Sequence, residues 1–567
     1  MLKTSLLAVV VLTTVAFASA MADTLSTIYD TSAPPAPVNQ IDKIVFAKLA
    51  SLKIRPVVCS DAVFVRRAYL DVIGKLPTAA EARTFIENKS RNKRTALIDD
   101  LLKRDEFADY WSMKWGDVLR IKAEFPINLW PNAAQAYHRW VRHSIAENKP
   151  YDQFARALLT SSGSNFRVGP VNFYRAIQNK NPEGIANAVA LTFMGARTDS
   201  WPKERLANMT VFFSQIGYKP TSEWKEENVF WDPLKASAAT DNIAPGHKKP
   251  TTVGQVVDPA KASKSSVQLA ALTATFPDGT KVRLNPDRDP REVFADWLIN
   301  PKNPWFARSI VNRTWAWLLG RGIIHEPDDI RDDNPPSNPK LLAYLESELV
   351  KNEYDLRHLY RLILTSRTYQ LSSIQRVRSD RAQANFANYP LRRLDAEVLI
   401  DAVNQVTGTR DLYTSPIPEP FTYIPKGMSA VSIADGSITS PFLALFGRSS
   451  RATGMSNERN NKQTSAQWLH MLNSGHIQRK LEQSGRIRAM FASSGGKPEE
   501  FLEELYLTIL SRFPTTEEVQ IAMSYGQPTA TPGKPNKFKK PSAAKRREHW
   551  IDVTWALINS PEFLFRH

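Results

Sequence analysis

Apolar positions repeat with helical spacing over two long parts of the chain, from residue 41 to about 220 and from residue 289 to the end. An apolar side chain returns there every three or four residues, which is the period of one buried helical face. Thr78 and Glu81 have the T-x-x-E pattern of a capping box, and Asn338 stands before a proline, where it can cap the next helix. The pattern predicts a mainly α-helical protein.

The connecting stretch, residues 221–288, has a different pattern. Pro, Gly, Lys and Ser are scattered through it, and Asp278-Gly279 separates two short alternating segments. Such a pair between alternating segments is typical of a β-hairpin. We therefore expect a small β-hairpin insertion here, and long surface loops at 409–440 and 524–545.

Two distant segments of the chain resemble each other. FVRRAYLDVIGKLPTAAEA (64–82) and FLEELYLTILSRFPTTEEV (501–519) align without gaps and share the Pro-Thr turn between two helices. A repeated helix–turn–helix unit indicates that the two copies pack as equivalent units. We therefore expect one intertwined multi-helix body rather than separate beads.

The N-terminus has the features of an export signal. Residues 1–22 combine an early lysine, the apolar run LLAVVVLTTVAF and small residues before a cleavage point after Ala20 or Ala22. An uncleaved anchor is the alternative, and no later stretch is long and apolar enough to span a membrane. We expect an exported protein, periplasmic or extracellular, in which residues 23–44 form a linker.

The chain is strongly basic and contains a single cysteine. The 567 residues carry a net charge of +17 and one cysteine, Cys59, so the fold depends on packing without an internal disulfide. We expect Cys59 to be a small, semi-buried apolar residue. Outside the cytoplasm the positive charge favours anionic polysaccharide, lipid headgroups or acidic proteins as partners over nucleic acid.

Common catalytic signatures are absent from the sequence. It contains no GxGxxG, P-loop, HExxH or GxSxG pattern. His138 and His143 are five residues apart, and His470 and His476 are six apart, so neither pair lies on one helical face. These spacings predict no histidine metal site.

The segment HEPDDIRDDNPPSNP (325–339) concentrates histidine and carboxylates. Carboxylates of this kind suit a calcium or magnesium site, although the EF-hand pattern is not met. The alternative is structural: Asp332 and Asp333 would lie near the positive end of the helix after Asn338, with arginines such as Arg331 as counter-charges. Both interpretations stay open.

A second candidate segment, 446–473, is rich in Arg, Asn and Ser ahead of a helix. Its Arg451, Glu458 and Arg459 could hold an anionic group at a helix start. An ordinary polar loop with a helix cap is the alternative.

Several long motifs resemble two known domain families. VRRAYLDVIGKLPTAAEA and GSNFRVGPVNFYRA resemble the planctomycete cytochrome-associated secreted domain (domain of unknown function 1549). RSIVNRTWAWLLGRGIIHEPDDIRDDNPPSNP, HLYRLILTSRTYQLSS and ALINSPEFLF resemble its usual companion, the planctomycete secreted domain (domain of unknown function 1553). The resemblance covers most of 45–220 and 289–567, and it implies an exported two-domain protein without a settled activity.

The chain departs from that resemblance at its cysteines. Many relatives carry C-x-x-C-H-x-H-P after a motif like LTFMG and C-x-C before a Glu-Arg pair. Here 195–206 reads GARTDSWPKERL, and 455–457 reads Met-Ser-Asn. Both sets of cysteines are missing together, as expected if they form one shared metal, haem or disulfide site. The CxxCH motif of a c-type haem domain is also missing. We therefore expect no haem, no bound metal and no other cofactor.

Our leading hypothesis is a non-catalytic binding or assembly component of the cell envelope, with an anionic glycan or a protein as partner. The alternative is an extracellular hydrolase of anionic polysaccharide, with Asp328 or Asp329 as an acid–base or metal-binding group and Arg308 or Arg313 holding the substrate. Whether the chain is an enzyme stays open. The candidate binding residues that fit the resemblance or the second segment are Arg308, Asn312, Arg313, Arg331, Asn334, Arg451, Glu458 and Arg459.

Overall fold

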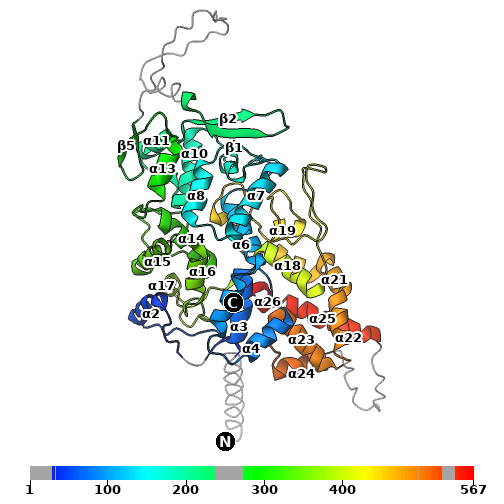
Figure 1. Cartoon of the computed structure of the whole chain (residues 1–567). Helices are drawn as coiled ribbons and strands as arrows, with labels where there is room; N and C mark the ends of the chain where they lie inside the picture. Colours follow the sequence, from blue (N-terminus) through cyan, green and yellow to red (C-terminus); the bar gives the residue numbers. More distant parts are fainter. Residues whose placement is uncertain (1–27, 32–33, 236–272, 496, 526–542) are drawn as a thin grey trace, which may run out of the picture.

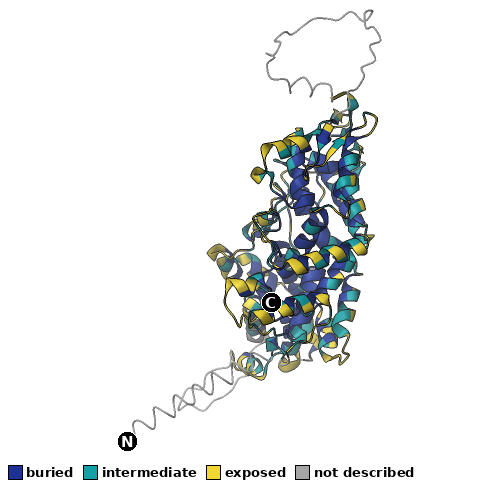
Figure 2. Ribbon diagram, turned by 90° about the vertical axis from the view of Figure 1, so that its left-hand side faces the viewer, coloured by how far each residue is buried: buried dark blue, intermediate teal, exposed yellow. Residues whose placement is uncertain are grey.

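The computed structural model describes residues 28–31, 34–235, 273–495, 497–525 and 543–567. The described chain is mainly α-helical, as predicted, with only short antiparallel β elements. It forms an elongated body whose buried residues run along its length beneath more exposed outer helices (Figure 2). The predicted signal peptide lies outside the described residues.

The N-terminal half is built mainly from helices, and one of them has the cap that the sequence predicts. Thr78 and Glu81 form both bonds of a capping box, as predicted. The predicted linker, residues 23–44, is partly structured: Asp30 forms an isolated β-bridge with Cys59, which is completely buried. The helices are α2 (Gln40–Ser51), α3 (Asp61–Val72), α4 (Ala79–Glu87), α5 (Lys93–Leu101), α6 (Asp105–Val118), α7 (Pro131–Ala146), α8 (Tyr151–Thr160), α9 (Asn172–Arg175), α10 (Pro182–Val189) with a π-helical turn (Ala190–Met194), and α11 (Lys203–Thr210).

Two β elements lie between the helical parts. The predicted hairpin is confirmed as β4 (Thr273–Thr275) and β5 (Lys281–Arg283), which are antiparallel. A second element was missed: β1 (Gly163–Ser164), β3 (Glu227–Trp231) and β2 (Ile216–Pro220) form an antiparallel sheet in that order. The sequence of β2, IGYKP, contains Gly and Pro, which are depleted in strands, so its pattern did not indicate one.

The C-terminal half returns to helices. Gly320, with φ of 72°, ends α14. The Asn338 side chain accepts a hydrogen bond from the Leu341 N–H and caps α15, as predicted. The elements are α13 (Pro290–Leu298), α14 (Phe306–Leu319), α15 (Pro339–Lys351), α16 (Leu356–Leu364), α17 (Asp380–Ala384), β6 (Arg392–Arg393), α18 (Ala396–Thr407), α19 (Pro441–Leu445), α20 (Ser465–Asn473), α21 (Gly475–Glu482), α22 (Gly485–Ser493), α23 (Pro498–Leu510), α24 (Thr516–Ser524), α25 (Ala543–Ile558), α26 (Pro561–Leu564) and β7 (Phe565–Arg566).

The two copies of the sequence repeat pack against each other. Ala79 and Ala82 of α4 form a buried cluster with Leu507 of α23, and these two helices lie side by side in Figure 1. Arg66 of α3 reaches into the other copy and donates a hydrogen bond to the Ile509 carbonyl at 2.7 Å. The expectation of one intertwined body is confirmed.

The segment 409–440 connects α18 to α19 without a helix of its own, as predicted, but it is not only a surface loop. Ala430 and Ile433 are completely buried. The Gly436 N–H donates to the Ile121 carbonyl at 2.9 Å, just after α6. Packing therefore holds this segment beside α6 and α7, where it rises next to α7 in Figure 1.

Candidate functional site

Asp328, the first predicted acid–base candidate, is buried with both carboxylate oxygens bonded. Arg313 Nη2 lies 2.8 Å from Oδ1, and the Ser456 N–H donates to Oδ2 at 2.6 Å. Burial by itself would raise the pKa of Asp328, but the Arg313 charge and the hydrogen bond from Ser456 outweigh it and lower the pKa. Only 1% of the residue is exposed. Asp328 is therefore a permanent, enclosed anion.

Arg313 makes this ion pair part of a junction between the two halves of the chain. Its Nη1 donates to the Thr192 carbonyl at 2.8 Å, and its Nη2 donates to the Leu191 carbonyl at 3.1 Å. Both carbonyls belong to the π-helical turn, which comes from the N-terminal half. The neighbouring Asn312 exchanges two hydrogen bonds with the Ile324 backbone, each 2.9 Å long.

The other residues of the 325–339 segment are not brought together around one point. Asp329 and Asp333 both pair with the half-exposed Arg331, at 3.4 Å and 3.2 Å. Asn334 donates to two backbone carbonyls of the same segment, and Arg308 of α14 pairs with Glu346 of α15 at 2.8 Å. Within the described ranges, no group of three or more His, Cys, Asp or Glu side chains could hold a metal ion.

The two regions in which relatives carry cysteines meet at this same segment. The Gly195 carbonyl accepts a hydrogen bond from the Ile330 N–H at 2.9 Å. Ser456 contacts Asp328 through its N–H, as described above, and Arg197 pairs with Glu326 at 3.2 Å. The regions 195–206 and 455–457 therefore both contact residues 326–330, although they are about 250 positions apart in the sequence.

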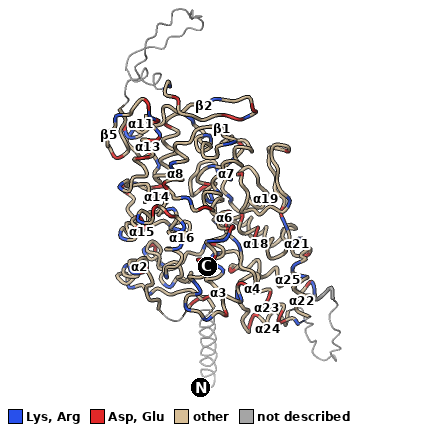
Figure 3. The backbone as a smooth tube through the Cα atoms, in the orientation of Figure 1, with Lys and Arg blue, Asp and Glu red and all other residues tan. Residues whose placement is uncertain are grey.

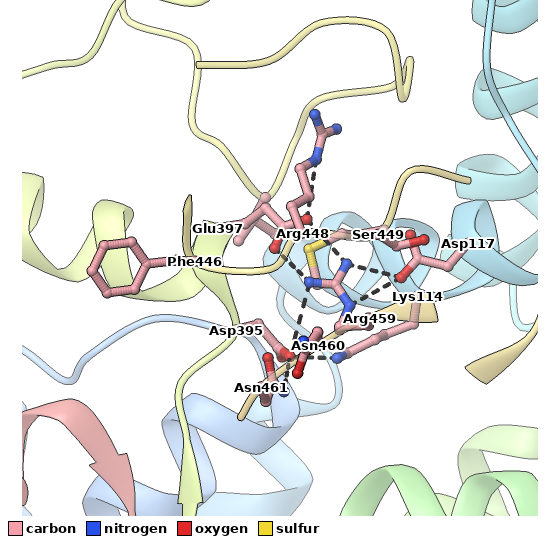
Figure 4. A network of polar contacts seen from close by, with 12 residues as sticks. Lys114, Asp117, Asp395, Glu397, Phe446, Arg448, Ser449, Arg459, Asn460 and Asn461 are labelled. Atoms are coloured by element: carbon pink, nitrogen blue, oxygen red, sulfur yellow. Dashed lines mark hydrogen bonds and ion pairs between the residues drawn. The ribbon is translucent and has the colours of Figure 1, made fainter. Parts of the chain in front are cut away.

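Arg451 and Arg459, two of the candidate binding residues, pair with buried carboxylates of the chain itself. Arg459 lies between Asp117 of α6, 2.8 Å away, and Glu397 of α18, 2.6 Å away (Figure 4). Arg451 pairs with the other oxygen of Asp117 at 3.0 Å. Burial would raise the pKa of Glu397, but the two arginines beside it, Arg459 foremost and then Arg448, hold its pKa at about 2. These ion pairs join α6 to α18.

The network continues with Lys114 and Arg566, which both pair with Asp395 at 2.7 Å and 3.0 Å. Sequence reasoning missed its carboxylates because Asp117 and Glu397 lie on helices with the pattern of an apolar core, and Asp395 directly precedes one of these helices. Glu458, the third predicted residue of this segment, accepts hydrogen bonds from the Ala452 and Thr453 N–H groups and so folds its own loop. The arginines of this segment are thus occupied by the fold.

An open cleft lies between α7 and the segment 420–438, and sequence reasoning missed it. Its volume is about 560 Å³. Asn132, Gln135 and Arg139 line one wall from successive turns of α7, and their side chains form no hydrogen bond or ion pair with other described residues. The opposite wall consists of Pro420, Phe421, Thr422, Tyr423, Pro425 and Met428, with Phe166, Asp435 and Ile438 completing the lining.

Aromatic side chains are exposed at the cleft and beside it. Tyr423 is 72% exposed and Phe421 48% exposed. The rings of Phe421 and Trp130 lie 5.2 Å apart between centroids, and the Lys225 ammonium lies 5.8 Å from the Trp130 ring. Trp130 has a φ of 74°, a strained backbone region that is concentrated at functional sites. Trp224, 67% exposed, extends this aromatic surface on the other side of Lys225.

Two buried polar atoms of the lining have no partner in the described chain. They are the Thr422 hydroxyl and the Oδ2 atom of Asp435. The other oxygen of Asp435 accepts from the Ala123 and Ser437 N–H groups, both at 2.8 Å. Unpartnered buried polar atoms also occur elsewhere in the described chain, so these two atoms do not by themselves mark a ligand site. The cleft was invisible in the sequence because these residues meet only through tertiary packing.

Two domain families match the chain. The family described as Protein of unknown function (DUF1549), PSCyt2, matches residues 40–203. The family described as Protein of unknown function (DUF1553), PSD1, matches residues 290–525. Neither a curated protein nor a solved structure matches the chain. Among the residues described, no helix is long and apolar enough to cross a membrane.

Proposed function

The chain belongs to the proteins that join a DUF1549 domain to a DUF1553 domain, and we propose that it is an exported, non-catalytic component that binds an acidic carbohydrate. The observation that carries the proposal is the open cleft between α7 and the segment 420–438, with exposed aromatic rings on one wall and unpartnered polar groups on the other. Export follows the prediction made from residues 1–22.

The aromatic wall suits sugar rings. A pyranose ring presents a face of C–H groups, which packs on a flat aromatic side chain while its hydroxyl groups stay in water. Tyr423 and Phe421 offer such faces already exposed to solvent, and Trp130 extends the surface beyond Phe421. A protein interface would bury such rings just as well, but the polar wall opposite favours a hydroxyl-rich ligand.

The polar wall supplies hydrogen bonds and positive charge. Asn132 and Gln135 each carry a donor and an acceptor in one planar group, which matches neighbouring sugar hydroxyls. Arg139 is exposed and free of ion pairs to other described residues, so its guanidinium can bind a carboxylate or sulfate group through two parallel hydrogen bonds. Basic and acidic residues otherwise intermingle along the body (Figure 3). The free arginine therefore gives the cleft its preference for acidic sugars.

The composition of the lining supports binding rather than hydrolysis. Glycoside hydrolysis ordinarily requires two carboxyl groups about 5–9.5 Å apart across the bond that is cleaved. Among the described residues that line the cleft, Asp435 is the one carboxylate. The earlier acid–base candidate Asp328 is 1% exposed and is enclosed by Arg313 and Ser456.

The test measures binding of the purified full chain to polygalacturonate, to a sulfated galactan and to neutral dextran. We expect binding to the two acidic polymers that weakens with added salt. Tyr423→Ala removes one stacking face and should weaken binding about tenfold, the effect of losing about 1.4 kcal/mol. Arg139→Gln should weaken binding to the acidic polymers and flatten the salt dependence.

The matched control is Tyr525→Ala, which removes an exposed tyrosine directly after the distant α24. It should bind like the wild type. The proposal fails if the wild type binds neither acidic polymer, or if Tyr423→Ala and Tyr525→Ala bind equally well. Release of reducing ends by the wild type, lost in Asp435→Asn, would instead establish the hydrolase alternative.

A further inference from the structure

His470 and His476 meet at a corner between two helices, far from the cleft residues in sequence. His470 lies in the last turn of α20, and His476 follows the Ser474 that caps α21. His470 Nε2 and His476 Nδ1 are 3.3 Å apart. The prediction that a spacing of six residues keeps these imidazoles apart holds for a single helix, but the chain turns between them.

A carboxylate fixes the orientation of one of these rings. Asp411 Oδ1 lies 2.7 Å from His476 Nε2, and Asp411 Oδ2 lies 3.0 Å from the Lys480 ammonium. Burial would raise the pKa of Asp411, but hydrogen bonding by His476 and the charge of Lys480 lower it. An ionised Asp411 accepts the proton on His476 Nε2, so the lone pair of Nδ1 points toward His470.

We propose that His470 Nε2 and His476 Nδ1 bind a transition-metal ion of the Zn²⁺ or Cu²⁺ class, with Asp411 as the positioning carboxylate. Two imidazole nitrogens bound to tetrahedral zinc at about 2.0–2.1 Å are about 3.3 Å from each other. The distance between the two histidines already has this value. A histidine ligand also ordinarily donates its second ring N–H to a carboxylate, which is the role that Asp411 holds.

The surroundings suit a preformed but accessible site. The Phe442 ring packs edge-on against His470 at 5.6 Å and against His476 at 5.9 Å, so both imidazoles are held in place. The His476 side chain remains 28% exposed, which leaves a path for an ion. The protein supplies two ligands there, because no third His, Cys, Asp or Glu of the described ranges completes the set. Water would fill the remaining positions.

The competing explanation is a plain hydrogen bond between the two imidazoles, with one proton shared. The two explanations differ in what they demand of Asp411. A hydrogen bond between the two rings requires no metal ion and makes no demand on Asp411. Metal binding requires both imidazole rings to be neutral, and it requires Asp411 to hold the His476 tautomer.

The test titrates the full chain, without a histidine tag and after removal of metals by a chelator, with Zn²⁺ in a calorimeter. We expect one equivalent to bind to the wild type. His470→Ala and His476→Ala should each lose this site, and Asp411→Asn should weaken it at least tenfold. Cu²⁺ bound in the same place should show two nitrogen ligands by electron paramagnetic resonance.

The control is His143→Ala, which removes an exposed histidine of α7 and should leave the titration unchanged. His470→Gln serves as a second variant in case the smaller alanine loosens the corner, and thermal melting in the absence of metal confirms that each variant is folded. The proposal is overturned if the wild type binds less than one equivalent, or if folded His470→Gln binds Zn²⁺ as the wild type does. Its outcome is independent of the carbohydrate assay.

Discussion

Arg459 and Asp117 are held together by two hydrogen bonds to one carboxylate oxygen, from Nε at 3.0 Å and from Nη2 at 2.8 Å. Asp117 gives its other oxygen to Arg451 at 3.0 Å. One carboxylate of the N-terminal half thus pairs with two arginines of the C-terminal half, and all three side chains are largely buried. These buried ion pairs join the two domains, and separating the domains would expose the charged side chains.

Asp117→Asn should therefore be strongly destabilising. The change removes the carboxylate that pairs with the buried Arg451, and an unpaired buried charge costs about 3–5 kcal/mol of the free energy of unfolding. Urea unfolding measures this loss. The control is Asp333→Asn, whose side chain is 75% exposed and should cost less than about 1 kcal/mol. Equal losses in the two variants would contradict the assignment.

Glu397 should make the protein sensitive to acid. Its pKa falls from an ordinary 4.5 to about 2 in the folded state, so its contribution to stability is complete above pH 4.5 and is lost as pH falls toward 2. The shift corresponds to about 3 kcal/mol. Glu397→Gln should be less stable than the wild type at pH 7, and the gap should narrow by that amount toward pH 2. A stability difference between the wild type and Glu397→Gln that stays constant with pH would contradict this prediction.

Asp401 should have the opposite effect on the pH dependence of stability: it should make the protein less stable as the pH rises. Burial raises its pKa from 3.8 to about 6, although it accepts hydrogen bonds from Ser429, Ala430 and Val431. A raised carboxyl pKa stabilises the fold below pH 4 and loses that contribution as pH rises through 6. Asp401→Asn should remove this slope, so its stability relative to the wild type rises by about 3 kcal/mol from pH 4 to pH 7. Chemical unfolding at several pH values checks it.

Local features of this fold could be predicted from the sequence. The Thr78 capping box, the Asn338 cap and the Gly320 terminus depend on neighbouring residues, and each is present. The repeat around Thr78 and Thr515 also predicted long-range packing, because two copies of one unit tend to bury the same face. Such predictions succeed where a short stretch of chain determines the geometry.

The candidate sites depend on contacts that no short stretch contains. Arg139 and Tyr423 face one cleft although nearly 300 positions separate them, and the charged residues Asp117 and Glu397 lie on helices with core-like apolar patterns. The spacing rule for His470 assumed one continuous helix, whereas the structure turns a corner before His476. Tertiary packing, rather than local propensity, creates these arrangements.

Asp328 and Asp329 are adjacent in sequence but should respond differently to the same change. Asp328→Asn removes the enclosed partner of Arg313 and should cost about 3–5 kcal/mol of the free energy of unfolding. Asp329→Asn affects a pair with Arg331, whose side chain is 44% exposed, and should cost less than about 1 kcal/mol. Differential scanning calorimetry of the two variants measures the two stability losses and so compares neighbouring residues of one segment. If Asp328→Asn keeps the stability of the wild type, Asp328 is not the framework anion described here, and its role as an acid–base group returns to consideration.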